Sequence, residues 1–173
     1  LLKKLKNISP QLIIANNVIA HVKDIDNFIK ALSKFSNDKT RISIEFPYVK
    51  NIVKKSQFDT IYHEHHYYYS IQTLSYLLNK HDLEIFDANY LNIHGGSYRV
   101  FVKKKNSKIK IKYKVTKLLN YENKIKLNSK FFYKNFQKKI NQIKVKSNRK
   151  IDKIIKNNNI IHAYGAAAKG NTF

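Results

Sequence analysis

The sequence lacks cysteine, methionine and tryptophan, and it contains few glycines, prolines and acidic residues. Without cysteine, neither a disulfide nor a thiolate metal site can form. No apolar run reaches the roughly 18 residues that a transmembrane helix needs, and residues 1–10 are too short and too charged for a secretory signal. We therefore expect a cytoplasmic protein that does not span a membrane. Because its 173 residues include no initiator methionine, we also expect a fragment of a longer protein.

Positive charge dominates the composition, with 34 Lys and Arg against 11 Asp and Glu and a formal net charge of +23. Such a charge favours nucleic acid as a partner. Arginine, which suits bidentate contacts with phosphate and guanine, nevertheless occurs at only three positions. Lysine and asparagine are spread along the chain, as an AT-rich genome would produce. We therefore expect a solvated lysine-rich surface and no specific nucleic-acid partner.

Hydrophobic periodicity predicts an α/β protein. Apolar residues occur in short runs, at helical spacing or in alternation, and caps and breakers separate these segments. The expected elements are a buried strand at 12–15, a helix at 24–36 capped by Asp24 or Asp26, a strand that stops at Pro47, a helix at 70–83 capped by Ser70, and two strands around a His-Gly-Gly turn within 83–104. This order indicates the later half of an α/β sheet with an antiparallel pair at its end.

Residues 104–158 have a different character. They are rich in lysine, with apolar residues at spacings of three and four, which predicts a linker and then one or two amphipathic helices. A basic amphipathic helix can lie on a membrane, but we favour packing against the protein itself. Residues 160–173 then resemble the opening of a second strand-turn-helix unit.

The segment TIYHEHHYYYS at 60–70 contains three histidines, a glutamate and four tyrosines. On a strand, His63 and His65 would share one face with Glu64 opposite, and a metal would still need a ligand from elsewhere. We therefore predict no metal site. Histidine, with an ordinary pKa of about 6.5, suits proton abstraction near neutral pH. The composition of the segment alone does not separate catalysis from a polar-aromatic cluster that satisfies its own hydrogen bonds.

The predicted sheet favours catalysis. His21 follows the first strand, and Tyr48 and the 60–70 segment follow the second. Ligands of open α/β sheets bind outside the carboxyl ends of the strands, so these side chains are expected to meet at one rim.

Two glycine motifs are weaker indications of a binding site. HGGSYR at 94–99 is explained most simply as a hairpin turn. YGAAAKG at 164–170 would place backbone N–H groups and a lysine near an anion such as a nucleotide diphosphate, although it is not a Walker loop.

Several of these motifs occur together in one known family. ANNVIAHVKD, EFPY, QFDTIYHEHHYYYS, HGGSYRVFV and YGAAAKGNT stand in the order found in the sugar C-methyltransferases, which this sequence resembles from about residue 11 onward. The resemblance is weakest in 104–158. Members of that family use S-adenosylmethionine to methylate a carbon of a nucleotide-linked keto-deoxysugar.

The resemblance implies a division of the chain into three parts. Residues 1–103 would form the second half of a Rossmann-like class I methyltransferase sheet. Residues 104–158 would be a helical connection, and 159–173 would begin a truncated C-terminal Rossmann-like domain that binds the nucleotide sugar.

The resemblance also implies roles for individual residues. His65 would be the general base, with Tyr62, Glu64 and His21 as its companions; Tyr62 or His21 would stabilise an enolate oxygen, and Glu64 would orient the sugar. Asn16, Asn17 and Val18 would form the far wall of the S-adenosylmethionine pocket. Contacts with the substrate are expected from a larger set, namely Tyr48, His63, His94, Gly95, Gly96, Ser97, Arg99, Gly165, Lys169 and Gly170.

Three features of the family pattern are not found among the 173 residues of this sequence. The glycine-rich loop for S-adenosylmethionine, the acidic residue for its ribose and the zinc-binding cysteines are not among them. We therefore expect zinc only in a missing N-terminal domain, and we expect the chain to be inactive by itself.

Two other functions stay open. One is a basic module that binds nucleic acid or a membrane surface without catalysis, which salt-dependent binding to a random oligonucleotide would reveal. The other is a metal-dependent enzyme that uses the histidine cluster. Metal analysis after His65→Ala would test it, because a mutated base keeps the metal and a mutated ligand loses it.

Overall fold

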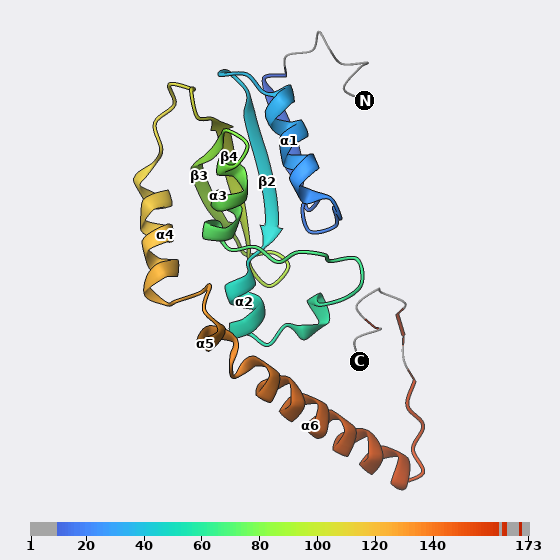
Figure 1. The fold of residues 1–173 in the computed structure, drawn as a ribbon. Helices are drawn as coiled ribbons and strands as arrows, with labels where there is room; N and C mark the ends of the chain where they lie inside the picture. The colour runs from blue at the N-terminus through green and yellow to red at the C-terminus, as the bar shows by residue number, and fades with distance from the viewer. Residues whose placement is uncertain (1–9, 163, 166–169, 171–173) are drawn as a thin grey trace.

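The structure is a computed structural model that describes residues 10–162, 164, 165 and 170. A four-stranded mixed sheet carries helices at its face and edge, and a helical arm extends away from it (Figure 1). The α/β class predicted from the sequence is thereby confirmed. In chain order the elements are β1 (Leu12–Asn16), α1 (Ile25–Phe35), β2 (Arg41–Pro47), α2 (Val49–Lys54), η1 (Phe58–Thr60), α3 (Ile71–Asn79), β3 (Leu83–Leu91), β4 (Ser97–Lys104), α4 (Tyr113–Lys124), α5 (Lys130–Tyr133) and α6 (Phe136–Lys156).

The strands lie in the order β1-β2-β4-β3. β1 and β2 are parallel and are joined through α1, whereas β4 runs antiparallel to both β2 and β3. The predicted antiparallel pair around the His-Gly-Gly turn is therefore present. Since the parallel strands end at the same edge, the segments that follow β1 and β2 leave the sheet side by side.

The capping residues read from the sequence begin the two helices on the sheet. The Asp24 side chain accepts a hydrogen bond from the backbone N–H of Asn27 at the start of α1. Ser70 and Thr73 form a reciprocal capping box at the start of α3. These bonds satisfy amide groups that a helix cannot pair internally, which fixes where each helix begins.

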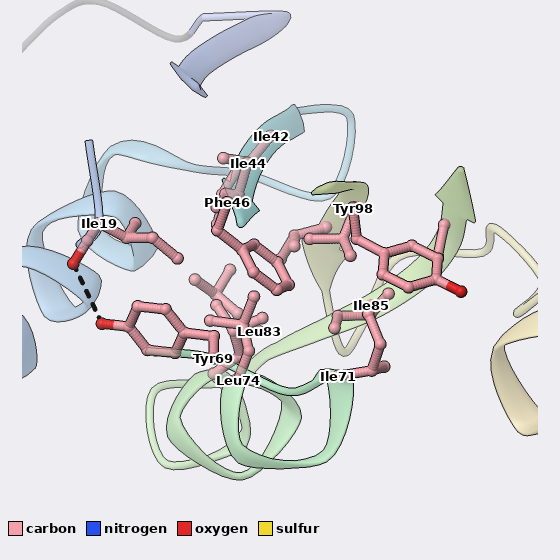
Figure 2. Close-up of a cluster of buried hydrophobic side chains, with 14 of the residues drawn as sticks. Ile19, Ile42, Ile44, Phe46, Tyr69, Ile71, Leu74, Leu83, Ile85 and Tyr98 are labelled. Atoms are coloured by element: carbon pink, nitrogen blue, oxygen red, sulfur yellow. Dashed lines mark hydrogen bonds between the residues drawn. The ribbon is translucent and has the colours of Figure 1, made fainter. Parts of the chain in front are cut away.

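The core lies between the sheet and the helices α1 and α3 (Figure 2). Phe46 of β2 is 1% exposed, and its ring meets the edge of the Tyr69 ring at 5.8 Å between centroids. The Tyr69 hydroxyl donates a 3.1 Å hydrogen bond to the carbonyl of Ile19 (Figure 2). This bond lets a tyrosine sit in the core with its polar atom satisfied, and it ties the end of the 60–70 segment to the turn after β1.

The first strand is less buried than the sequence predicted. Ala15 faces the core, but Leu12 and Ile14 are 55% and 65% exposed. The prediction of a buried strand is therefore wrong for one of its two faces. β1 is an edge strand, and alternate side chains point to the face opposite α1, where no helix within the described residues covers them.

Residues 113–156 form three helices where one or two were predicted. α4 packs beside β3 and α3, with Val115 buried and Leu118 and Leu119 against the core. None of the residues of α6 is buried within the described part of the chain, and this helix projects away from the sheet (Figure 1). In the ranges that the structure describes, no helix is both long enough and apolar enough to cross a membrane.

The strand predicted near 160–165 does not form in the described residues of that segment. Ile160, Ile161 and Tyr164 are exposed, and no strand pairs with them among the described residues. A β-strand requires backbone hydrogen bonds to a neighbouring strand, and the described residues of this segment have none. Lys169, a predicted substrate contact, lies outside the described residues.

Candidate functional site

A hollow of about 290 Å³ opens at the carboxyl ends of β1 and β2. Four segments form its walls: the turn after β1, the end of β2, η1 with the loop that follows it, and the hairpin between β3 and β4. The lining residues are Asn17, Ala20, His21, Glu45, Pro47, Thr60, Tyr62, His65 and His94. His21, Tyr62 and His65, three of the four predicted catalytic residues, thus share one hollow.

The 61–69 segment is a loop rather than the strand assumed for His63 and His65. It is held to the turn after β1 by hydrogen bonds from the His66 backbone N–H to the Ala20 carbonyl and from the Tyr67 hydroxyl to the Lys23 carbonyl. The Tyr69 bond to Ile19 adds a third attachment. These attachments place the His65 ring 4.8 Å from the His21 ring, centroid to centroid.

His65 is oriented by the backbone. Its Nδ1 lies 2.8 Å from the carbonyl oxygen of Thr60. A carbonyl can only accept, so Nδ1 carries the hydrogen and, in the neutral ring, the lone pair is on Nε2. That atom lies 3.5 Å from the Tyr62 hydroxyl, and the two rings are 4.5 Å apart.

Tyr62 is kept in its protonated form. Burial raises the pKa of its hydroxyl, and the nearby Glu64 carboxylate raises that pKa further. At neutral pH the group is therefore a hydrogen-bond donor at the wall of the hollow.

Glu64 and His63 lie outside the hollow. Their side chains are 52% and 68% exposed, and the His63 Nε2 is 4.0 Å from the Glu64 carboxylate. Glu64 therefore does not reach the wall beside His65, although it was predicted as a companion of that base. The loop turns at these residues, so neighbouring side chains do not alternate as they would on a strand.

Tyr48 also lies away from the hollow. It is 2% exposed, its ring meets that of Tyr98 at 4.9 Å, and its hydroxyl is buried. Burial, and then the charge of Glu122, raises the pKa of this hydroxyl well above its usual range. The residue predicted to contact substrate is therefore part of the core.

The 94–99 motif contributes one residue to the hollow. His94, with a φ of 49°, lines it, and the turn continues through Gly95 and Gly96 at φ 78° and 115°. L-residues with a side chain rarely adopt such positive φ values, so the backbone conformation of the turn favours glycine at both positions. Ser97 is fully buried in β4.

Of the three residues predicted to form the cofactor wall, one lines the hollow. Asn17 lines the hollow. The Asn16 side chain instead accepts a 3.0 Å hydrogen bond from Ser43 on the face of the sheet, and Val18 is 38% exposed outside the hollow. Gly165 and Gly170 have no atom within 4 Å of the place where a Cβ would stand, so neither packs against the site.

Sequence reasoning missed Glu45. This carboxylate is 2% exposed at the end of β2 and lines the hollow. Arg99 donates to its Oε2 through Nε at 2.9 Å and Nη2 at 2.7 Å. The available signal was an acidic residue between the apolar residues Ile44 and Phe46 of a predicted strand, since buried carboxylates are rarely without a partner.

Metal ligation receives no support from the described residues. Within them, no group of three or more His, Asp or Glu side chains is placed to hold a metal ion.

Two sequence comparisons point to one class of protein. Residues 92–173 match the family model described as "C-methyltransferase C-terminal domain". The chain is also 26% identical over 160 residues to the C-methyltransferase NovU of Streptomyces niveus, a match that covers 92% of this chain and 38% of that protein. The resemblance to C-methyltransferases inferred from the motifs is thereby confirmed. The chain spans little more than a third of the length of that relative.

Two solved structures of methyltransferases align with part of the chain. The mitomycin 7-O-methyltransferase MmcR gives a TM-score of 0.48 at 10% identity, over 58% of this chain and 32% of the other. The magnesium protoporphyrin IX methyltransferase ChlM of Synechocystis PCC 6803, solved with bound SAH, gives 0.43 at 13% identity, over 58% and 48%. Because both scores are below 0.5, we base the α/β assignment on the sheet itself.

Proposed function

We propose that this chain is part of an S-adenosylmethionine-dependent C-methyltransferase that acts on a nucleotide-linked keto-deoxysugar, with His65 as the base. The observation that carries the proposal is the setting of His65. The Thr60 carbonyl fixes its tautomer, and His21 and Tyr62 stand beside it in one hollow at the carboxyl edge of the sheet.

The proposed reaction begins with a proton transfer. A carbon next to a ketone is acidic enough for imidazole to deprotonate it when the resulting enolate is stabilised. The C–H bond breaks, the proton moves to Nε2 of His65, and the electron pair moves onto the ketone oxygen. The Thr60 carbonyl then holds the other N–H of the imidazolium, so the ring keeps its orientation while it carries the proton.

Tyr62 is the better placed of the two candidate donors to the enolate oxygen. Its raised pKa keeps the hydroxyl protonated, and the hydroxyl lies close to the nitrogen that takes the proton. His21, whose ring contacts that of His65, would then serve to orient the ketone.

The residues present fit part of the site for the methyl donor. When bound, S-adenosylmethionine supplies an electrophilic methyl group for the carbon nucleophile. Asn17 offers a carboxamide in the wall of the hollow, at the edge where ligands of such sheets bind. We assign residues 1–103 to the methyltransferase domain, 104–158 to a helical connection and 159–173 to the start of the nucleotide-sugar domain, with Gly165, Lys169 and Gly170 facing the nucleotide.

The test uses the complete gene product and a panel of nucleoside-diphosphate keto-deoxysugars, with methyl transfer from labelled S-adenosylmethionine as the readout. His65→Ala should reduce transfer by about 10²- to 10⁴-fold, the usual contribution of a general base. It should equally slow the exchange of the acidic C–H with deuterated solvent.

The matched control is His66→Ala, which removes a neighbouring imidazole that does not line the hollow. It should leave transfer within about twofold, because surface substitutions away from a site have small effects. Equal losses in the two variants would contradict the assignment of the base. A wild-type protein that transfers no methyl group to any sugar of the panel would contradict the substrate class.

A further inference from the structure

Glu45 forms an ion pair with Arg99, and it also forms two hydrogen bonds with Asn17 in the wall of the hollow. Asn17 has a φ of 55°, and its backbone N–H donates a 2.8 Å hydrogen bond to the carbonyl of Glu45. Its side-chain Nδ2 donates to Glu45 Oε1 at 3.1 Å. Both the backbone and the side chain of Asn17 are therefore held by one residue of the neighbouring strand.

The two carboxylate oxygens of Glu45 have separate partners. Arg99 occupies Oε2 with two N–H groups, and Asn17 occupies Oε1. An ionised carboxylate can only accept, so the amide nitrogen of Asn17 must face it. The guanidinium also compensates the charge of Glu45, which leaves the wall of the hollow without a net negative charge there.

The orientation of Asn17 follows from this arrangement. With Nδ2 directed at Glu45, the carbonyl oxygen Oδ1 points away from the carboxylate. The described residues provide no hydrogen-bond partner for that oxygen, and Asn17 lines the hollow with an exposed side chain. The Asn17 Oδ1 atom is therefore an acceptor already oriented toward a ligand in the hollow, and the side chain need not reorganise when the ligand binds.

We propose that Glu45 is a positioning residue of the cofactor site, which fixes the Asn17 carboxamide oxygen to accept a hydrogen bond from an N–H or O–H group of S-adenosylmethionine. This inference rests on the proposed function. Glu45 acts entirely through Asn17, which separates the proposal from a plain ion pair in the sheet.

The experiment measures the affinity of the complete gene product for S-adenosylhomocysteine by calorimetry, since this probe carries the same N–H and O–H donors. Glu45→Gln should weaken binding about tenfold. In that variant the Arg99 guanidinium attracts the new amide oxygen. The new NH₂ group then faces Asn17, whose carboxamide must turn its own NH₂ into the hollow.

The control Glu84→Gln makes the same change in another ion pair of the sheet. Glu84 accepts a 2.6 Å hydrogen bond from the buried Lys103 at the far end of β3 and β4. The affinity of the Glu84→Gln variant for S-adenosylhomocysteine should stay within about twofold of the wild type, even if the variant is less stable.

A double-mutant cycle tests whether Glu45 acts through Asn17. Asn17→Gly keeps the ion pair, accepts the positive φ without strain and should lose about the same tenfold. In that background Glu45→Gln should have no further effect, because the group it positions is gone.

The outcomes separate the two levels of the proposal. A wild-type protein that does not bind S-adenosylhomocysteine overturns the proposed function and this inference with it. If Asn17→Gly binds S-adenosylhomocysteine as tightly as the wild type does, the inference is overturned and the proposed function stands. The same holds if the losses of affinity in the two single variants add in the double variant.

Discussion

The properties of His65, the proposed base, depend on the residues around it. The hydrogen bond to the Thr60 carbonyl determines which ring nitrogen carries the hydrogen. The hydrogen bonds between the loop and the turn after β1 bring His21 beside the ring. The sequence could predict that His21 and the 60–70 segment would meet, because the residues that follow parallel strands lie at one edge. The choice of His65 among the histidines came from the resemblance to the sugar C-methyltransferases. The sequence could not predict that Glu64 would face solvent, since that depends on how a loop without regular periodicity turns.

At the residue scale, Tyr62→Phe should lower the turnover number for methyl transfer by about 10²-fold, as expected for the loss of one donor to a developing oxyanion. The Michaelis constant and the affinity for S-adenosylhomocysteine should change little, because the bond strengthens in the transition state. Steady-state kinetics of the complete gene product measure both. An increase in the Michaelis constant at unchanged turnover would show that Tyr62 binds the sugar and does not stabilise the enolate.

At the element scale, α4 is fastened to α3 by a buried carboxylate. Glu122 of α4 is fully buried and accepts hydrogen bonds from the backbone N–H groups of Ile71 and Gln72, at 2.9 and 2.8 Å. A negative charge at the first turn of a helix satisfies its unpaired amides and its dipole. Burial, and then this charge, raises the pKa of Tyr98 to about 12, so its hydroxyl stays protonated.

Glu122→Gln should therefore lower the free energy of unfolding by about 1–3 kcal/mol, because a neutral amide leaves one buried N–H of α3 poorly paired. Urea denaturation of this chain gives the value.

Asp152→Asn, on the exposed helix α6, makes the same chemical change without a buried partner and should stay within about 0.5 kcal/mol of the wild type. If the two variants are equally stable, Glu122 does not fasten α4 to α3.

The elements that the sequence predicted best are those whose determinants are local. The Ser70 cap and the alternation that ends at Pro47 can be recognised without knowledge of the rest of the chain. The exposure of Leu12 was missed because it depends on β1 being an edge strand. The division of residues 113–156 into three helices was also missed, since its lysine-rich periodicity continues across the breaks.

At the scale of the whole molecule, charge is the most unbalanced quantity. The formal net charge is +23, and the lysines within regular elements lie on α1, α2, β4, α4, α5 and α6. Mutual repulsion of like charges destabilises a compact state and is screened by salt. Thermal stability of this chain should therefore increase with ionic strength, by about 3–5 °C between ~20 mM and ~0.5 M NaCl.

A charge-changed variant provides the comparison for this measurement. Lys153→Glu combined with Lys156→Glu on α6 changes the formal charge by two units at each position, from +23 to +19, and should flatten the salt dependence. Calorimetric melting curves at four salt concentrations give the salt dependence of the melting temperature for the wild type and the variant. A melting temperature that falls with added salt would mean that attractive ion pairs, such as Lys103 with Glu84, outweigh the repulsion.

The turn at Gly95 and Gly96 has a consequence for the gene. Both residues have positive φ, and a Cβ on Gly96 would lie 2.1 Å from the Asn51 amide nitrogen. Every first- or second-base change in a glycine codon introduces a side chain or ends translation, so we expect that nucleotide variation at these two codons is confined to the third base.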